Sequence, residues 1–247
     1  MKRFLNSLAQ IVQRLIPQQC LLCGSWLPLE QLGQHPRTVW CAACDHDLPR
    51  LPASHCHVCA VPLPSGEICG ACLKRPPRFA RVSAALVYRY PADALIHAFK
   101  YGANLALADP MADLLADVLT DGADIIVPLP LAPNRLRERG FNQAHEIGRR
   151  IARRTGIALA GAVCRKVLDT AAQAALPWKE RARNVRGAFV CEADLSGLTV
   201  AVVDDVMTSG ATLNELARTL RRAGASRVIG WVVARAVRRD WLPVLPD

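Results

Sequence analysis

The sequence has no uninterrupted run of about 18 apolar residues, the minimum for a transmembrane helix, although 51% of its 247 residues are hydrophobic. We therefore expect a protein that is not an integral membrane protein and that has enough apolar side chains for a sizeable core. Internal repeats and low-complexity tracts are also absent, apart from recurring Cys-x-x-Cys pairs. This absence excludes a repeat architecture.

The N-terminal segment lacks two features of a secretory signal. No small-x-small cleavage site follows it, and polar residues interrupt its apolar part, at Asn6, Ser7, Gln10, Gln13 and Arg14. We therefore expect no secretion. The apolar residues of segment 1–19 instead follow a helical stripe, which predicts an amphipathic N-terminal helix. Docking on its own protein is the first interpretation of this helix, and contact with a membrane surface is the second.

Acidic residues are few relative to basic ones. The chain has 31 Lys and Arg against 21 Asp and Glu, a formal charge of +10. From Arg135 to Arg186 there are 13 basic residues against four acidic ones. Such an excess favours anionic partners, namely phosphates, nucleic acid or a membrane surface. A solvated helical face is the alternative interpretation of the same run.

Eight of the ten cysteines form four Cys-x-x-Cys pairs, separated by 17, 11 and 9 residues. The pairs are Cys20/Cys23, Cys41/Cys44, Cys56/Cys59 and Cys69/Cys72. Two intervening residues let both sulfurs reach one tetrahedral metal, so the spacing predicts two four-cysteine zinc sites. Disulfides, iron–sulfur ligation and redox chemistry are the alternatives. We expect sequential pairing of the motifs, while a cross-braced arrangement remains open.

The two zinc sites are expected to be structural. Four sulfurs fill every position on each metal, so no position stays open for a substrate. Segment 20–76 has too little apolar surface for a core of its own, and metal binding would supply its folding free energy. The run Lys-Arg-Pro-Pro-Arg at 74–78 marks a linker to a second domain, at residues 80–240.

Apolar runs alternate with helical patterns in residues 80–240. The expected strands are 82–90, 124–130, 158–167, 199–206 and 227–237. The expected helices are 92–119, broken near Tyr101-Gly102 and at Pro110, then 141–154 and 211–224. This alternation predicts the α/β class, with a mainly parallel sheet covered by helices on both faces.

The segment Val-Val-Asp-Asp-Val-Met-Thr-Ser-Gly-Ala-Thr, at 202–212, carries the clearest chemical signal. We expect the strand to end near Val203, just before Asp204 and Asp205, at the sheet edge where ligands bind in α/β proteins. The loop that follows presents N–H groups and hydroxyls at a helix N-terminus, which suits a phosphate. Its residues are Thr208, Ser209, Gly210, Ala211 and Thr212. Carboxylates accept hydrogen bonds from vicinal hydroxyls, so the segment predicts a cradle for a ribose 5-phosphate.

This segment resembles the phosphoribosyl pyrophosphate (PRPP) signature of type I phosphoribosyltransferases. Together with segments 128–144 and 169–189 and the cysteine-rich front, it resembles the ComF family, from about Cys20 to Val237. The resemblance implies a type I phosphoribosyltransferase-like domain behind a zinc module. It also implies a cytoplasmic role in competence, DNA uptake or DNA utilization, with PRPP and Mg²⁺ at the acid pair. The resemblance further implies a competence helicase as partner and a peripheral location at the inner membrane face.

The resemblance also assigns expectations to basic residues elsewhere. Arg135 and Arg139 would hold the pyrophosphate, because arginine grips phosphate oxygens in pairs. Lys166 would close on the same anion from a mobile loop. Plain surface charge is the alternative interpretation for all three.

Single-stranded DNA is the expected partner of the basic run. Trp178, Arg181 and Arg183 are the candidate contacts, because aromatic rings beside cations can stack on splayed bases. Phe141 and Phe189 are interleaved with the same charges. The alternative interpretation is that both rings are buried in the core. The leading hypothesis is a ComF-type protein that binds PRPP and single-stranded DNA. The alternatives are a catalytic phosphoribosyltransferase acting on a base or an amine, and a zinc-dependent interaction module with a non-catalytic PRPP sensor.

Overall fold

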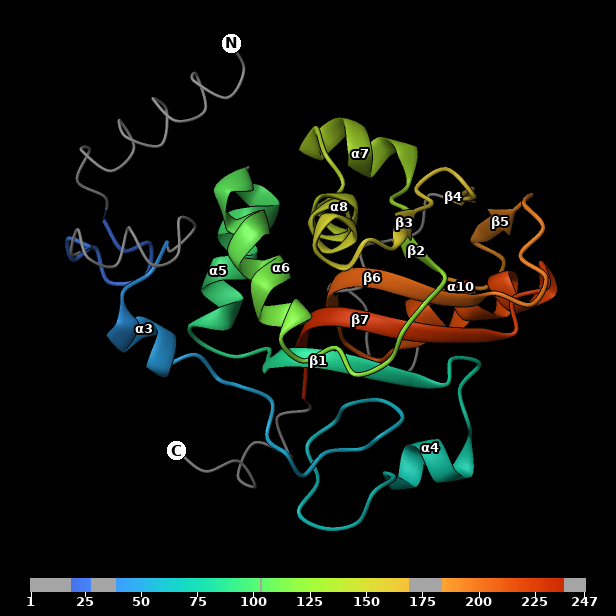
Figure 1. Ribbon diagram of the computed structural model, residues 1–247, viewed down its shortest axis with the longest axis horizontal. Helices are drawn as coiled ribbons and strands as arrows, with labels where there is room; N and C mark the ends of the chain where they lie inside the picture. Colours follow the sequence, from blue (N-terminus) through green and yellow to red (C-terminus); the bar gives the residue numbers. More distant parts are fainter. Residues whose placement is uncertain (1–18, 28–38, 103, 169–183, 238–247) are drawn as a thin grey trace.

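A computed structural model describes residues 19–27, 39–102, 104–168 and 184–237. Their central element is a five-stranded sheet in the order β1-β7-β6-β2-β3 (Figure 1), and all four neighbouring pairs are parallel. The strands are β1 (Arg81–Val87), β7 (Arg227–Arg235), β6 (Thr199–Met207), β2 (Ile125–Pro128) and β3 (Ala158–Leu159). The predicted parallel sheet is therefore confirmed. The expected N-terminal helix lies almost entirely outside the described residues.

Helices cover one face of this sheet. They are α5 (Ala92–Tyr101), the short 3₁₀ helix η1 (Leu105–Leu107), α6 (Ala108–Ala116) and α8 (Gln143–Thr155). Figure 1 shows α5, α6 and α8 above the strands. Successive strand residues point to opposite faces, so Ala201 and Val203 pack under these helices while Val200 and Val202 belong to the other core.

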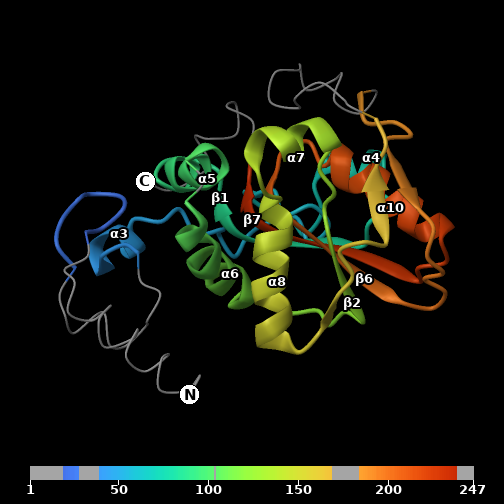
Figure 2. The ribbon, with the colours of Figure 1, turned by 90° about the horizontal axis from the view of Figure 1, so that it is seen from above.

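The opposite face has a mixed cover. It is formed by α10 (Ala211–Arg222), by the antiparallel hairpin of β4 (Cys164–Lys166) and β5 (Phe189–Cys191), and by the second group of cysteines. Figure 2 shows α10 on the other side of the strands from α6 and α8. The sheet is thus buried on both sides, which is why its strands read as continuous apolar runs.

The two cysteine groups lie apart in the fold. The first is beside α3 (Ala42–His46), at the left of Figure 1, and the second is beside α4 (Gly70–Lys74), below the sheet. The connecting segment runs along the edge of β1, where the Val87 N–H donates to the Pro49 carbonyl at 2.7 Å. After the second group, the Arg78 N–H donates to the Asn214 side chain on α10 at 2.7 Å.

Four local expectations need correction. β1 ends at Val87 rather than residue 90, and the expected strand 158–167 is two short strands, β3 and β4, in different sheets. Pro110 does not break a helix, because it lies in the first turn of α6, where its missing N–H has no helical partner to lose. A helix that was not expected, α7 (Pro133–Arg139), follows β2.

Candidate functional site

The acid pair lies within a strand rather than after it. β6 continues to Met207, paired with β7 up to Met207↔Arg235. The expected strand range 199–206 is therefore nearly right, and the expected end near Val203 was wrong. On its other side the ladder with β2 does end at Pro128↔Val203. Asp204 and Asp205 therefore sit on the projecting end of a central strand, where one neighbouring strand has already stopped. Their backbone is fixed by β7 while the β2 side is open to other groups.

Asp205 is buried and has a cationic partner. Its side chain lies 3.0 Å from the Lys100 ammonium, which comes from the end of α5, and it also accepts the Val206 N–H at 2.7 Å. Burial disfavours the charged ammonium, but the carboxylates of Asp205 and then Asp204 outweigh that effect and raise the pKa of Lys100 above its ordinary value. Lys100 thus neutralises the charge of Asp205, one of the two adjacent acids.

Asp204 is in a different electrostatic state. It accepts the Asp205 N–H at 2.9 Å. Burial raises the pKa of Asp204 from 3.8 to about 8, and the charge of Asp205 adds to the rise, while Lys100 opposes it. A carboxyl group of this kind holds its proton near neutral pH and can both donate and accept a hydrogen bond. The two adjacent acids thus differ in their surroundings, because Asp205 is paired with Lys100 whereas burial raises the pKa of Asp204.

The loop after β6 has the geometry of an anion cradle. Gly210 has φ +75°, the left-handed region that favours glycine. It precedes α10, whose N-terminus has no side-chain cap, although the Ser209 hydroxyl accepts the Ala211 N–H at 3.3 Å. The hydroxyl residues Thr208, Ser209 and Thr212 are partly exposed. Uncapped N–H groups at a helix start bind phosphate well, as the sequence predicts for residues 208–212.

The expected pyrophosphate residues occupy three different environments. Arg135 forms an ion pair with Glu138 within α7 at 2.9 Å. Arg139 donates to Gln143 at 3.2 Å, and its guanidinium lies 5.2 Å from the centre of the Tyr101 ring. Since Tyr101 follows Lys100, this contact places Arg139 at the same sheet edge as the acids. Lys166 is in β4, opposite Phe189 on β5, on the other side of the sheet from Lys100.

Three side chains at this edge were missed by sequence reasoning. Lys100 is one. The others are Tyr101, whose ring is 62% exposed, and Gln143, which is buried, with an amide nitrogen that has no partner among the described residues. Lys100 and Tyr101 stand at the expected helix break before Gly102, and a charge at such a break was an available signal. Gln143 is the first residue of α8.

The predicted DNA contacts are placed only in part. Trp178, Arg181 and Arg183 lie outside the described residues. Phe189 is buried, and Phe141 packs on Phe99 with ring centres 5.6 Å apart, so both belong to the core.

Much of the basic run is already neutralised. Arg149 and Arg150 both pair with Glu146, at 2.8 and 2.7 Å. Arg154 contacts Asp113, and Arg165 lies 2.8 Å from Glu192. Ion pairing of this extent lowers the positive field that a phosphate backbone would meet over α8.

The cysteines gather in two groups of four with sequential pairing. One holds Cys20, Cys23, Cys41 and Cys44, the other Cys56, Cys59, Cys69 and Cys72, and within each group all sulfurs lie within 4.8 Å of one another. The Cys23–Cys41 and Cys59–Cys69 sulfurs are 3.8 and 3.7 Å apart. Sulfurs bound at about 2.3 Å to one tetrahedral zinc lie about 3.8 Å apart. Both donor sets therefore fit structural zinc, and the sequential pairing expected from the sequence is confirmed.

The environments of the two zinc sites differ. The second group is buried throughout and belongs to the core on the α10 face of the sheet. In the first group only Cys20 is buried, and Cys23 is exposed. The second site thus lies within the core on the α10 face, whereas the first is more exposed and contributes Cys20 to the core on the helix face.

Comparison with family models agrees with both halves of the chain. A model described as a double zinc ribbon domain matches residues 11–73, and one described as a phosphoribosyl transferase domain matches residues 146–245. The second match includes β6, the acid pair and the loop before α10. The expected type I phosphoribosyltransferase-like fold with an N-terminal zinc module is confirmed.

Individual relatives extend over nearly the whole chain. The DNA utilization protein YhgH of Salmonella typhimurium is 32% identical over 231 residues, which cover 90% of this chain and 99% of that protein. Competence protein F of Haemophilus influenzae is 30% identical over 230 residues, 88% of this chain and 97% of that protein. Among solved structures, the glutamine PRPP amidotransferase of B. subtilis is 21% identical, with a TM-score of 0.37, over 51% of this chain and 25% of that chain. The two long alignments place this chain in the ComF family, alongside these DNA utilization and competence proteins.

Proposed function

We propose that the protein binds PRPP at the end of β6, with its phosphoribosyl half in the cradle formed by Asp204, Asp205 and residues 208–212. The observation that carries this proposal is the juxtaposition of the acid pair with an uncapped helix start across one glycine turn. The 5-phosphate takes the N–H groups of the loop, and the ribose hydroxyls bond to the carboxyl groups.

The diphosphate half needs its own cations. We assign Mg²⁺ and Arg139 to it, because Arg139 lies at the same edge as Lys100 through its contact with Tyr101. Arg135 and Lys166 are further candidates, and each would first have to leave its present neighbours. Mg²⁺ prefers phosphate and carboxylate oxygens, and with Asp205 already paired to Lys100 the metal would depend chiefly on the diphosphate.

Titration of the separate parts of PRPP tests this assignment. Isothermal titration calorimetry would compare PRPP, ribose 5-phosphate and pyrophosphate, each with Mg²⁺. Binding of ribose 5-phosphate that weakens in Gly210→Ala supports the cradle. Pyrophosphate binding that weakens in Arg139→Gln supports the second half. Tight binding of pyrophosphate alone, with no contribution from the sugar phosphate, would contradict the assignment.

We also propose single-stranded DNA as the macromolecular partner, through Trp178, Arg181 and Arg183. The support is the basic composition of the chain and the names of its relatives. Each phosphate that a protein neutralises makes its affinity fall by somewhat less than tenfold for a tenfold rise in salt concentration. Replacing Arg181 and Arg183 by Ala should therefore weaken binding to an oligonucleotide and reduce the salt slope. Binding that is unchanged in affinity and slope would contradict the proposal.

A catalytic phosphoribosyltransferase is the second candidate. The exposed Tyr101 ring beside Lys100 favours it, because a planar acceptor could stack there within reach of the cradle. This function requires pyrophosphate release that depends on an added base or amine and disappears in Asp205→Asn. PRPP binding without such release would instead favour a PRPP sensor that acts with the zinc module.

Location and protein partners follow from the resemblance alone. We propose a cytoplasmic protein, peripheral at the inner membrane face, with a competence helicase as partner. No helix in the described part of the chain is long and apolar enough to cross a membrane. Cell fractionation at low and high salt tests the location, since a peripheral protein is released from membranes by salt.

A further inference from the structure

Arg235 is a buried arginine at the point where three strands end. It is the last residue of β7, pairs with Val87 of β1 and Met207 of β6, and is 5% exposed. No carboxylate of the described residues lies within ion-pairing distance of it. A buried guanidinium without a carboxylate partner is costly, so its place in the fold needs a specific reason.

The guanidinium of Arg235 joins two parts of the chain that are distant in sequence. Its Nε donates to the carbonyl of Cys59 at 2.7 Å, across 176 positions. Its Nη1 donates to the carbonyls of Met207, at 3.2 Å, and of Thr208 and Ala236. Cys59 belongs to the second zinc site. Met207 ends β6, and Thr208 begins the loop of residues 208–212, which we call the phosphate loop. One side chain therefore holds the backbone of both.

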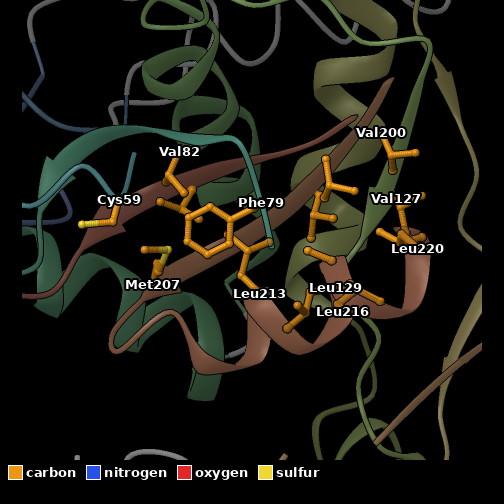
Figure 3. Packing of buried hydrophobic residues seen from close by; sticks show 14 of the residues in the cluster. Cys59, Phe79, Val82, Val127, Leu129, Val200, Met207, Leu213, Leu216 and Leu220 are labelled. Atoms are coloured by element: carbon orange, nitrogen blue, oxygen red, sulfur yellow. The ribbon is translucent and has the colours of Figure 1, made fainter. Parts of the chain in front are cut away.

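Packing makes the same connection. Cys59, Phe79, Met207 and Leu213 belong to one apolar cluster, in which Figure 3 shows the Phe79 ring between Met207 and Leu213. A Cβ placed on Gly210 would lie 3.3 Å from the Met207 side chain and 3.8 Å from Phe79. The phosphate loop thus rests on side chains of the same core cluster that contains the second zinc site.

The charge of the zinc site supplies the missing counter-charge. Four thiolates around one Zn²⁺ carry a net charge of −2. Arg235 is in contact with the backbone of one of these ligands, so an occupied site stabilises the buried guanidinium and an empty one does not. Among the described residues the first zinc site has no such link, and it lies beside α3, at the opposite end of the molecule from α4 (Figure 1).

We propose that Arg235 is a positioning residue that couples zinc at Cys56, Cys59, Cys69 and Cys72 to phosphate-ester binding at residues 207–212. When the metal leaves, the Cys59 carbonyl shifts and the counter-charge disappears, Arg235 releases the Met207 and Thr208 carbonyls, and the loop loses its fixed N–H directions. Coupling is reciprocal, so a ligand in the loop must in turn retain the zinc. This inference rests on the proposed binding of PRPP.

Zinc release to a chromophoric chelator measures the coupling without any activity assay. The Cys23→Ser chain would first be used, because loss of one ligand weakens the first site and leaves the second as the main source of tightly held zinc. At equilibrium with the chelator, saturating PRPP should raise the zinc affinity of the second site by about fivefold or more, the lower end of ordinary coupling. In a Cys72→Ser chain, in which the second site is weakened instead, PRPP should leave the zinc affinity of the first site unchanged.

Substitution of Arg235 tests the bridge itself. Arg235→Lys keeps the charge but has too few directed donors for four carbonyls. It should lower the zinc affinity of the second site and reduce the PRPP effect to less than about twofold, short of the ordinary range of coupling. Arg227→Met is the matched control, since Arg227 begins the same strand, is exposed and contacts Asp121. It should behave as wild type in both respects.

The outcomes separate the two proposals. If PRPP does not bind wild-type protein, the proposed function fails and the coupling fails with it. If PRPP binds but the zinc affinity of the second site is unchanged, the coupling alone is overturned. The comparison with and without PRPP does not depend on substituting Arg235. The proposal can therefore be refuted even if the Arg235→Lys chain folds poorly.

Discussion

The Lys100 ammonium lies 3.0 Å from the carboxylate of Asp205, although 105 positions separate the two residues. Because Asp205 is buried, loss of the ammonium would leave an uncompensated charge in the protein interior. Breaking such a pair costs about 3 kcal/mol or more. We predict a loss of this order in the free energy of unfolding of Lys100→Met, measured by urea denaturation.

The double variant Lys100→Met/Asp205→Asn provides the control for this pair. Removing both charges should cost less than the two single substitutions added together, because contacting residues are not additive. Strict additivity would show that the ion pair contributes nothing to stability.

The raised pKa of Asp204 predicts a pH effect of defined sign. Between pH 4 and pH 8 the folded state keeps the proton of Asp204, with its pKa of about 8, while the unfolded state releases it at its ordinary value of 3.8. The folded state then binds more protons, so stability falls as pH rises through this window. Relative to Asp204→Asn, wild type should lose about 1.4 kcal/mol or more, the equivalent of one pKa unit. A difference that is constant with pH would refute the assignment.

Gly210→Ala should affect both stability and binding. A Cβ at φ +75° is strained by about 1–2 kcal/mol, and it would press on the Met207 side chain at 3.3 Å. Gly156→Ala is the matched control, because Gly156 has the same φ of +75° at the end of α8 and nothing within 4 Å. The thermal unfolding temperature should be lowered in both variants, and ribose 5-phosphate binding should weaken in Gly210→Ala alone. Equal ribose 5-phosphate binding by the two variants would show that the loop is not part of the binding site.

The two zinc sites should differ in their effect on stability. Cys72→Ser opens a buried site within the core, and we expect a decrease of about 4 kcal/mol or more in the free energy of unfolding, the range of metal loss from a core. Cys23→Ser affects an exposed ligand of the less buried site and should cost less. Zinc content and denaturant unfolding of both variants check this order. A larger decrease in Cys23→Ser would reverse the proposed roles.

The repetitive features of the fold could be predicted from the sequence. Apolar runs such as 199–206 and 227–237 mark β6 and β7 because strands buried on both faces need apolar residues at every position. The Cys-x-x-Cys spacing gives both metal sites for a similar reason, since it is set by local geometry. Strand ends are less predictable. β6 continues through Asp204 and Asp205 because β7 offers a ladder there, and only the tertiary structure reveals that partner.

The partners of the site residues could not be predicted. Lys100 meets Asp205 because α5 crosses the sheet edge, and Arg235 meets Cys59 because the second zinc site packs below β7. Neither of these contacts produces a recognisable pattern in the local sequence. Arg235, a charge inside the apolar run 228–237, was visible in the sequence, but its bridging role depends on contacts over long sequence distances.

The decisive test of PRPP binding at the acid pair is titration of PRPP with Mg²⁺ into wild-type protein and into Asp204→Asn/Asp205→Asn. Zinc content and thermal unfolding would first establish that the variant is folded. We predict micromolar binding to wild type, with one site per chain, and loss of this binding in the variant. Equal affinity in the two proteins, or no binding to wild type, would contradict a ribose phosphate cradle at the end of β6.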